Sequence, residues 1–218
     1  MNTDTTQHPA YIRQAWLVIL LGLVYGAALA GVQVGLGPRI EENKRQETYG
    51  VIPRLVPGAD AKHIEPITLE AVGGKPRRVY RAADSNGELR GWVIPASGLG
   101  FADRIDLLIG LDSHAERITG MYVLDQKETP GLGNLIVDER FRDQFVKKSV
   151  FEPIDVVKTD PKPGSNQIRA VTGATISSDS VASIINKAVE QLREPILEQQ
   201  KAVPITDPEK RGASPAAK

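Results

Sequence analysis

The sequence Ala170-Val171-Thr172-Gly173-Ala174-Thr175-Ile176-Ser177-Ser178 joins a short apolar segment to a helical pattern. After it, apolar residues recur at helical spacing along one face, at Val181, Ile184, Ile185, Ala188, Val189 and Leu192. This period predicts an amphipathic helix whose apolar face packs on a core. We expect Ser177 or Ser178 to cap it, because a hydroxyl accepts hydrogen bonds from N–H groups that lack helical partners.

The turn before this helix has the residue types of an anion site. Gly173 lets the backbone bend or a ligand approach closely. Thr175 lies beside the helix N-terminus, where unpaired N–H groups and the helix dipole favour a phosphate. A plain helix cap explains the same residues. No Lys, His, Asp or Glu is next to Thr175 to activate its hydroxyl, so any modification there requires another enzyme.

Two motifs carry a resemblance to a known family. Residues 172–175 (Thr-Gly-Ala-Thr) resemble the Ser/Thr-Gly-Ala-Thr motif of domains that carry covalent FMN. Residues 128–133 (Glu-Thr-Pro-Gly-Leu-Gly) match that family's loop motif letter for letter. Behind an N-terminal apolar segment, these motifs resemble the G subunit of the Rnf-type ion-translocating electron transport complex. The C subunit of the sodium-translocating NADH:quinone reductase is its sibling, and the resemblance covers residues 12–195.

The resemblance implies a cofactor and a set of site residues. Thr175 would be joined to the FMN phosphate by a phosphoester bond that a separate flavin transferase makes from FAD. The other residues expected to bind the cofactor are Thr172, Gly173, Ala174, Glu128, Thr129, Leu132 and Gly133. We expect the 128–133 loop to pack on or near the flavin ring. On spacing alone, this loop is an ordinary strand-to-helix connector.

The composition excludes several other classes of protein. Lys and Arg total 27 and Asp and Glu total 27, so the formal net charge is zero. A nucleic-acid partner is not expected, because binding phosphates needs a basic excess. The chain has no Cys, which excludes disulfides and Cys-ligated iron–sulfur clusters or haem. Its three histidines are scattered and fit no metal spacing, so we expect no metal site.

An apolar run from Ala15 to Leu36 predicts a transmembrane helix. No charged residue lies between Arg13 and Arg39, and about 20 apolar residues span a bilayer core. Trp16 lies where an interfacial anchor would. A cleaved signal peptide is the alternative, because Ala28-Leu29-Ala30 resembles a cleavage site. The run continues beyond that site, which favours a retained helix.

Two arguments about orientation conflict. Arg39, Lys44 and Arg45 follow the apolar run, whereas only Arg13 and the amino terminus precede it, and the positive-inside rule then favours a cytoplasmic domain. The resemblance implies a soluble domain on the periplasmic side of the inner membrane, where flavin transfer occurs. We follow the resemblance and expect a single-pass inner-membrane protein.

The rest of the chain predicts one α+β domain with a mainly antiparallel sheet. Asn86-Gly87 is a strong hairpin signal. Short polar turns separate strand patterns, which cover residues 78–83, 89–94, 104–111 and 117–124. Residues 138–145 predict a helix with Phe141 and Phe145 on one face. Loops are expected over 51–66 and 159–166, which contain Pro and Gly.

These patterns give a domain organisation. We expect in order a cytoplasmic N-terminus, a transmembrane helix, a membrane-proximal helix and linker, an FMN-binding domain and a disordered tail, over residues 1–14, 15–36, 37–66, 67–198 and 199–218.

We therefore expect an electron-relay flavoprotein subunit of a membrane-bound, ion-translocating ferredoxin:NAD oxidoreductase, with the other subunits and the flavin transferase as partners. No Gly-x-Gly-x-x-Gly follows a strand, so no NAD fold, catalytic residue or turnover by this subunit alone is expected. One alternative is a membrane-anchored regulatory FMN-binding protein. The other is a nonflavin anchor or assembly protein, in which residues 172–175 only cap a helix.

Overall fold

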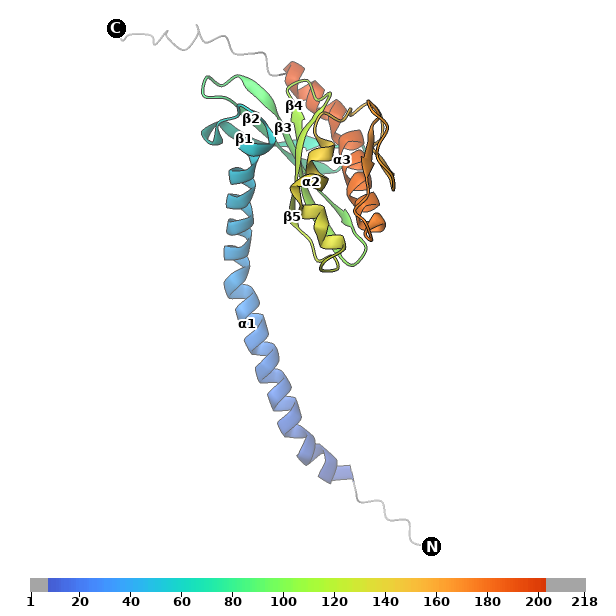
Figure 1. Cartoon of the computed structure of the whole chain (residues 1–218). Helices are drawn as coiled ribbons and strands as arrows, with labels where there is room; N and C mark the ends of the chain where they lie inside the picture. The colour runs from blue at the N-terminus through green and yellow to red at the C-terminus, as the bar shows by residue number, and fades with distance from the viewer. Residues whose placement is uncertain (1–7, 203–218) are drawn as a thin grey trace, which may run out of the picture. The chain divides into compact units, whose positions relative to one another are not determined.

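The computed structural model describes residues 8–202, with side chains described from residue 15 to residue 201 (Figure 1). It divides into two compact units, Met1–Glu47 and Thr48–Lys218. The expected N-terminus, 1–14, and tail, 199–218, lie largely outside the described residues. Within the described residues, the first helix begins at His8 and the last continues to Ala202.

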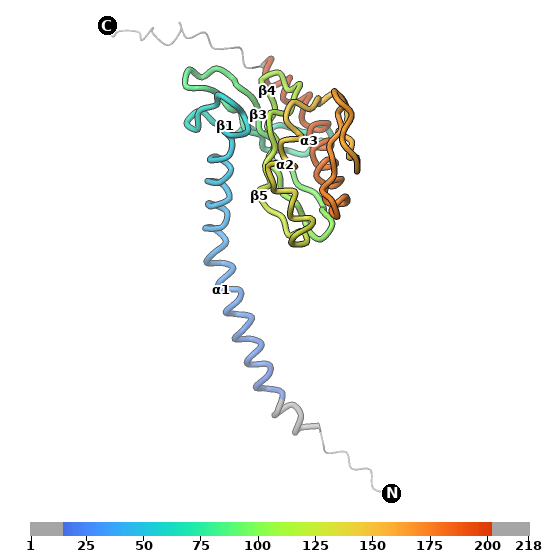
Figure 2. Tube along the Cα trace, in the orientation of Figure 1, coloured from blue at the N-terminus to red at the C-terminus, as the bar shows by residue number. Residues whose placement is uncertain are grey.

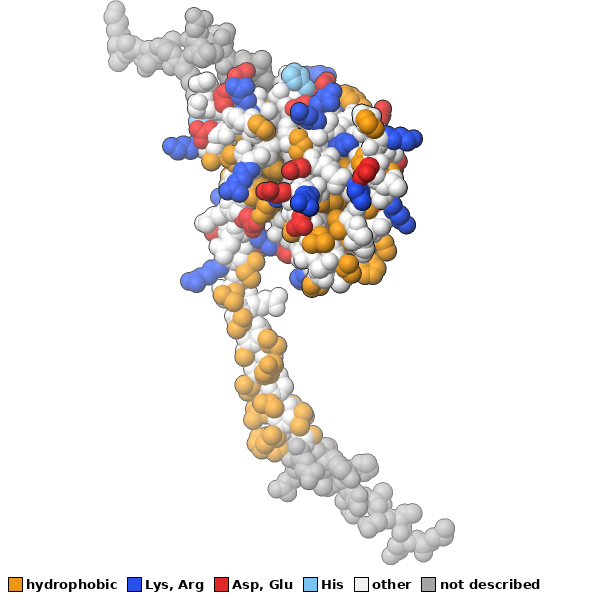
Figure 3. All heavy atoms as spheres, in the orientation of Figure 1, with side chains coloured by type: hydrophobic (Ala, Val, Ile, Leu, Met, Phe, Trp, Pro, Cys, Tyr) orange, Lys and Arg blue, Asp and Glu red, His pale blue; other side chains and the backbone are white. Residues whose placement is uncertain are grey.

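The first helix, α1 (His8–Leu55), is apolar on all sides over much of its length. It contains an 18-residue window of mean hydropathy 2.2, none of which is buried within the protein. Figure 3 shows apolar side chains covering the visible face of this segment. Length and composition therefore suit a membrane-spanning helix. The helix continues through Leu36 and through the charged residues that follow.

The last turns of α1 belong to the second unit. Val51, Ile52, Leu55 and Val56 are buried in a cluster with residues of the sheet, so the chain stays helical to Leu55. A short 3-10 helix, η1 (Ala61–His63), and strand β1 (Ile64–Glu70) follow. The prediction of a loop over 51–66 was therefore wrong except at residues 56–60, which belong to no helix or strand. Burial of the apolar side chains overrides the local Pro and Gly signals.

The domain is built on a five-stranded antiparallel sheet in the order β1-β2-β3-β4-β5. Its other strands are β2 (Pro76–Ala83), β3 (Leu89–Leu99), β4 (Arg104–Asp112) and β5 (Ile118–Asp125). The four strands predicted from sequence and the hairpin at Asn86-Gly87 are confirmed. β1 was missed because Pro66 lies within it. An edge strand tolerates proline, which has no N–H to donate to a neighbour.

Different helices cover the two faces of the sheet. The long helix α3 (Thr175–Ala202) packs on one face, as Figures 1 and 2 show. There its apolar stripe meets a continuous core that includes Trp92, Ile94, Leu107, Ile109, Val181, Ile185 and Leu192. The end of α1 packs on the other face, against Tyr80, Val93 and Leu108. The amphipathic pattern of 181–192 therefore predicted the correct face of α3.

A chain of short elements connects β5 to α3. It contains η2 (Gly133–Val137), α2 (Glu139–Arg142), η3 (Asp143–Phe145) and a parallel pair, β6 (Asp155–Val157) and β7 (Gln167–Arg169). The helix predicted over 138–145 is thus one α-helical turn followed by one 3-10 turn. The Phe141 and Phe145 rings still meet edge to face, with centroids 5.4 Å apart. No regular element interrupts residues 159–166, the expected loop.

Candidate functional site

Residues of both sequence motifs line one small cavity. The cavity has a volume of about 310 Å³. It is lined by Phe101, Thr129, Leu132, Gly133, Gly173, Ala174, Thr175, Ile176 and Ser177. The fold thus brings together segments 128–133 and 172–175 with a third segment, the turn between β3 and β4.

Helix α3 begins at Thr175 itself, three residues earlier than a Ser177 cap would allow. Ser178 Oγ donates to the Ala174 carbonyl at 3.0 Å and accepts the Val171 N–H at 3.0 Å. Ser177 Oγ donates to Glu128 Oε2 at 2.6 Å. The prediction that Ser177 or Ser178 caps the helix was therefore wrong. Both hydroxyls have other partners and lie inside the first turn.

Thr175 is placed for contact with a ligand. It is half-buried and lines the cavity, while Ala174 before it is buried. Within the described residues 8–202, its hydroxyl makes no hydrogen bond, in contrast to the hydroxyls of Ser177 and Ser178. The N–H groups of the first helical turn have no intrahelical acceptors. An anion bound beside Thr175 would accept hydrogen bonds from these N–H groups and would lie at the positive end of the helix dipole.

Gly173 brings the two motifs into contact. Its φ of +81° lies in the left-handed region, and a Cβ there would lie 2.8 Å from Leu132 Cδ2. In the facing loop, Gly131 has a φ of +76°. This bend lets the N–H groups of Leu132 and Asn134 both donate to the Thr129 carbonyl, at 3.2 Å each. The glycines in both motifs therefore serve the turns that close the cavity.

Glu128 is buried and is not among the residues that line the cavity. Its side chain is only 4% exposed. Oε1 accepts the Ala102 N–H at 3.1 Å, and Oε2 accepts the Ser177 hydroxyl. The carboxylate thus bridges the β3–β4 turn and the first turn of α3. The sequence indicated neither partner, because they lie 26 and 49 residues away.

Apolar side chains that sequence reasoning missed form much of the cavity wall. Phe101 is 62% exposed and Ile176 is 56% exposed, and Leu132, which was expected, is 45% exposed. Large apolar residues that line a cavity and remain exposed mark binding sites. The available signal for Phe101 was an aromatic residue in a glycine-containing turn, outside any strand pattern.

Most of the other expected site residues line the cavity, but one does not. Thr129, Leu132 and Gly133 line the cavity with Gly173, Ala174 and Thr175. Thr172 is exposed and lies outside that lining, next to it in the chain.

Comparisons with known proteins show the family to which the chain belongs. A family model described as the FMN-binding domain matches residues 100–190. The G subunit of the Na(+)-translocating ferredoxin:NAD(+) oxidoreductase complex of Acetobacterium woodii is 32% identical over 185 residues, which cover 80% of this chain and 87% of that protein. The G subunit of the proton-translocating ferredoxin:NAD(+) oxidoreductase complex of Clostridium ljungdahlii is 33% identical over 169 residues, covering 78% and 84%.

The chain belongs to the G-subunit family of ion-translocating oxidoreductase complexes. The crystal structure of Shewanella oneidensis NqrC shares the fold, with a TM-score of 0.65 at 20% identity, over 74% of this chain and 100% of that chain. The expected family and the α+β fold are therefore confirmed. As a member of this family, the chain is an FMN-binding electron-transport subunit, and its apolar N-terminal helix suits anchoring in a membrane.

The residues of the cavity fit FMN. Three apolar side chains, Phe101, Leu132 and Ile176, offer surfaces for a planar ring. Gly133 and Gly173 leave backbone open to close approach, and the α3 N-terminus offers N–H groups to a phosphate. Among the described residues, no cluster of His, Cys, Asp or Glu could hold a metal ion.

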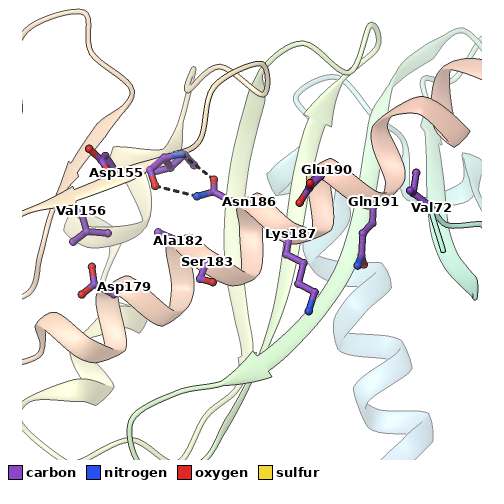
Figure 4. A pocket seen from close by; sticks show the side chains of 11 residues that line it. Val72, Asp155, Val156, Asp179, Ala182, Ser183, Asn186, Lys187, Glu190 and Gln191 are labelled. Carbon is purple, nitrogen blue, oxygen red and sulfur yellow. Dashed lines mark hydrogen bonds between the residues drawn. The ribbon is translucent and has the colours of Figure 1, made fainter.

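A larger hollow of about 550 Å³ lies elsewhere, along α3. Figure 4 shows Asn186 pointing to the segment before β6 and Lys187 pointing to the other side of the helix. The Asn186 amide accepts the Ile154 N–H at 2.9 Å and donates to the Ile154 carbonyl at 3.0 Å. These bonds fasten the β6 segment to α3. The residues that line this hollow belong to neither motif.

Proposed function

We propose that this chain carries FMN joined through a phosphoester to Thr175 and relays electrons inside a membrane-bound, ion-translocating ferredoxin:NAD oxidoreductase complex. One observation carries the proposal. The two motifs, distant in sequence, line a single cavity in which the Thr175 hydroxyl stands at the start of α3. The FMN-binding family match over 100–190 covers both motifs.

The chain's own residues have distinct roles in this proposal. The first-turn N–H groups of α3 stabilise the charge of the phosphodiester. Phe101, Leu132 and Ile176 exclude water from the ring and hold it by apolar contact. Thr129, which also lines the cavity, offers a second hydroxyl. When bound, flavin accepts two electrons together and releases them singly, which suits a relay between two-electron and one-electron carriers.

A separate flavin transferase makes the bond in this proposal. No general base lies beside Thr175, so its hydroxyl is a weak nucleophile unless an enzyme activates it. Thr175 is the acceptor rather than Thr172, because only Thr175 combines a place in the cavity with a place at the helix start. The covalent bond keeps the cofactor on an open site, where noncovalent binding alone would lose it.

Other subunits of the complex determine the coupling ion. Relatives named for sodium and for proton translocation are 32% and 33% identical to this chain. The sequence identity of this subunit therefore does not distinguish the two coupling ions. We propose that α1 crosses the inner membrane once, through residues 15–36, and that the domain faces the periplasm. The basic residues Arg39, Lys44 and Arg45 oppose this orientation. The periplasmic orientation is supported by the requirement that Thr175 be accessible to the flavin transferase.

In-gel flavin fluorescence after denaturation tests the attachment. Full-length protein is produced in cells that contain or lack the flavin transferase. We expect a fluorescent band only with the transferase, its loss in Thr175→Val, and its retention in Thr172→Val. A band in Thr175→Val would move the bond elsewhere. No band in any folded, membrane-inserted variant would favour the nonflavin anchor or assembly protein.

A further inference from the structure

A buried acidic side chain with two long-range partners lies beneath the proposed flavin site. Glu128 accepts hydrogen bonds on both oxygens, from the Ala102 N–H and the Ser177 hydroxyl. Acceptance on both oxygens suits an ionised carboxylate. Within the described residues, it forms no ion pair with a Lys, Arg or His side chain. Burying a charge without a neighbouring cation costs free energy. We therefore expect Glu128 to have a structural or functional role.

Two glycines provide room for this carboxylate. A Cβ at Gly133 would lie 2.8 Å from Ser177 Oγ and 2.9 Å from Glu128 Oε2. A Cβ at Gly100 would collide with Glu128 Oε1. The β3–β4 turn, the 128–133 loop and the first turn of α3 therefore all pack directly on Glu128.

Each of these contacts adjoins a residue that lines the cavity. Ala102 follows Phe101, Glu128 precedes Thr129, and Ser177 lies two residues after Thr175. Glu128, which is not among the residues that line the cavity, thus contacts all three segments that do line it.

We propose that Glu128 is the positioning residue of the flavin site, a claim that rests on the proposed attachment of FMN at Thr175. Its carboxylate holds the Thr175 turn through Ser177, and it holds the Phe101 wall through the Ala102 N–H. It also places a fixed negative charge behind the cofactor. That charge disfavours adding electrons to a flavin in the cavity and lowers the midpoint potential.

The test compares full-length Glu128→Gln, Ser177→Ala and the double variant with wild type. Exposed residues supply matched controls, Glu139→Gln on α2 and Ser183→Ala on α3. The first measurement is amide hydrogen exchange of the protein before flavin is attached. We expect the Ala102 amide to exchange faster, by about tenfold or more, in Glu128→Gln and not in the controls.

The second measurement is the initial rate of FMN attachment by the transferase. We expect about a tenfold lower rate in Glu128→Gln and in Ser177→Ala. The double variant should be little slower than either single variant, because the two residues share one contact. The third measurement is the midpoint potential of the attached flavin, which should rise in Glu128→Gln and change less in Ser177→Ala, where the charge remains.

The outcomes separate the two proposals. Wild-type exchange, attachment rate and potential in a folded Glu128→Gln protein would overturn the positioning role and leave the flavin proposal intact. Failure of wild type and of Ser183→Ala to take up FMN would overturn the proposed function. Fast exchange at Ala102 with an unchanged attachment rate and an unchanged potential would limit Glu128 to a structural contact and would contradict the inference.

Discussion

Asp84 and Glu128 are both buried acidic residues of the domain, and they organise the chain over different distances. The Asp84 carboxylate accepts the N–H groups of Asn86 at 2.9 Å and Glu88 at 3.0 Å, and it pairs with Arg90 at 2.8 Å. All its partners lie within six residues. Glu128 instead joins segments 26 and 49 residues away. The comparison suggests that Asp84 closes one hairpin, whereas Glu128 assembles the walls of the flavin site.

Removing each carboxylate should give the largest difference between Glu128 and Asp84, measured as the loss in the free energy of unfolding. Glu128→Ala leaves the Ser177 hydroxyl and the Ala102 N–H without their acceptor, and each such buried group is costly. We expect a loss of about 2–4 kcal/mol in the free energy of unfolding. Asp84→Ala should cost less, because water can reach the hairpin groups. Denaturant unfolding of both full-length variants in detergent checks this. Equal losses would remove the distinction in stability.

Two glycines provide a smaller contrast. Gly133→Ala crowds Glu128 and Ser177, and overpacking of this kind costs about 1–3 kcal/mol. Gly87→Ala, in the Asp84 hairpin, meets no atom within 4 Å, so only its φ of +84° opposes the new side chain. We expect that strain to cost about 1–2 kcal/mol. Gly133→Ala should also slow FMN attachment, whereas Gly87→Ala should not. Slower attachment in both variants would show a general response to destabilisation.

At low pH, the stability of the wild-type protein should change relative to that of a variant with an amide at position 84. Burial acts to raise the pKa of Asp84, but hydrogen bonds from the Glu88 N–H, the Arg90 guanidinium and the Asn86 N–H, with the Arg90 charge, lower it below 3.8. The unfolded chain therefore binds the proton more readily. The contribution of Asp84 is complete above its unfolded pKa, near 3.8, and is lost as the pH falls through the lower folded pKa.

The corresponding experiment follows stability against pH in wild type and in Asp84→Asn. The difference between the two proteins should be constant near neutrality and shrink as the pH falls below 3.8. A difference that grows on acidification would have the wrong sign for this pKa shift.

The smallest effects are expected on the flavin spectrum. Phe101 and Leu132 lie on segments that pack on Glu128 and line the cavity. Phe101→Ala and Leu132→Ala should shift the absorption bands and the midpoint potential of the attached flavin. Leu99→Ala is the control, because Leu99 is 82% exposed and lines a neighbouring hollow instead. Unchanged spectra in both cavity variants would place the ring elsewhere.

The difference between local contacts, such as those of Asp84, and long-range contacts, such as those of Glu128, explains which features the sequence could predict. The Asn86-Gly87 hairpin, the strands with alternating residues and the apolar face of α3 depend on local pattern, and all were predicted correctly. The motif residues were identified by resemblance. The partners of Glu128 and the place of Phe101 depend on how distant segments pack, which local pattern does not encode. The helical residues 51–55 were missed for the same reason, because their burial against the sheet overrides local signals.

Mass spectrometry of the wild-type chain tests the central claim most directly. Full-length protein is produced with the flavin transferase, digested, and searched for a peptide heavier by one FMN less one water. We predict that the added mass lies on Thr175, and that protein produced without the transferase lacks it. An added mass on Thr172 or on another residue, or no added mass when the transferase is active, would contradict the account.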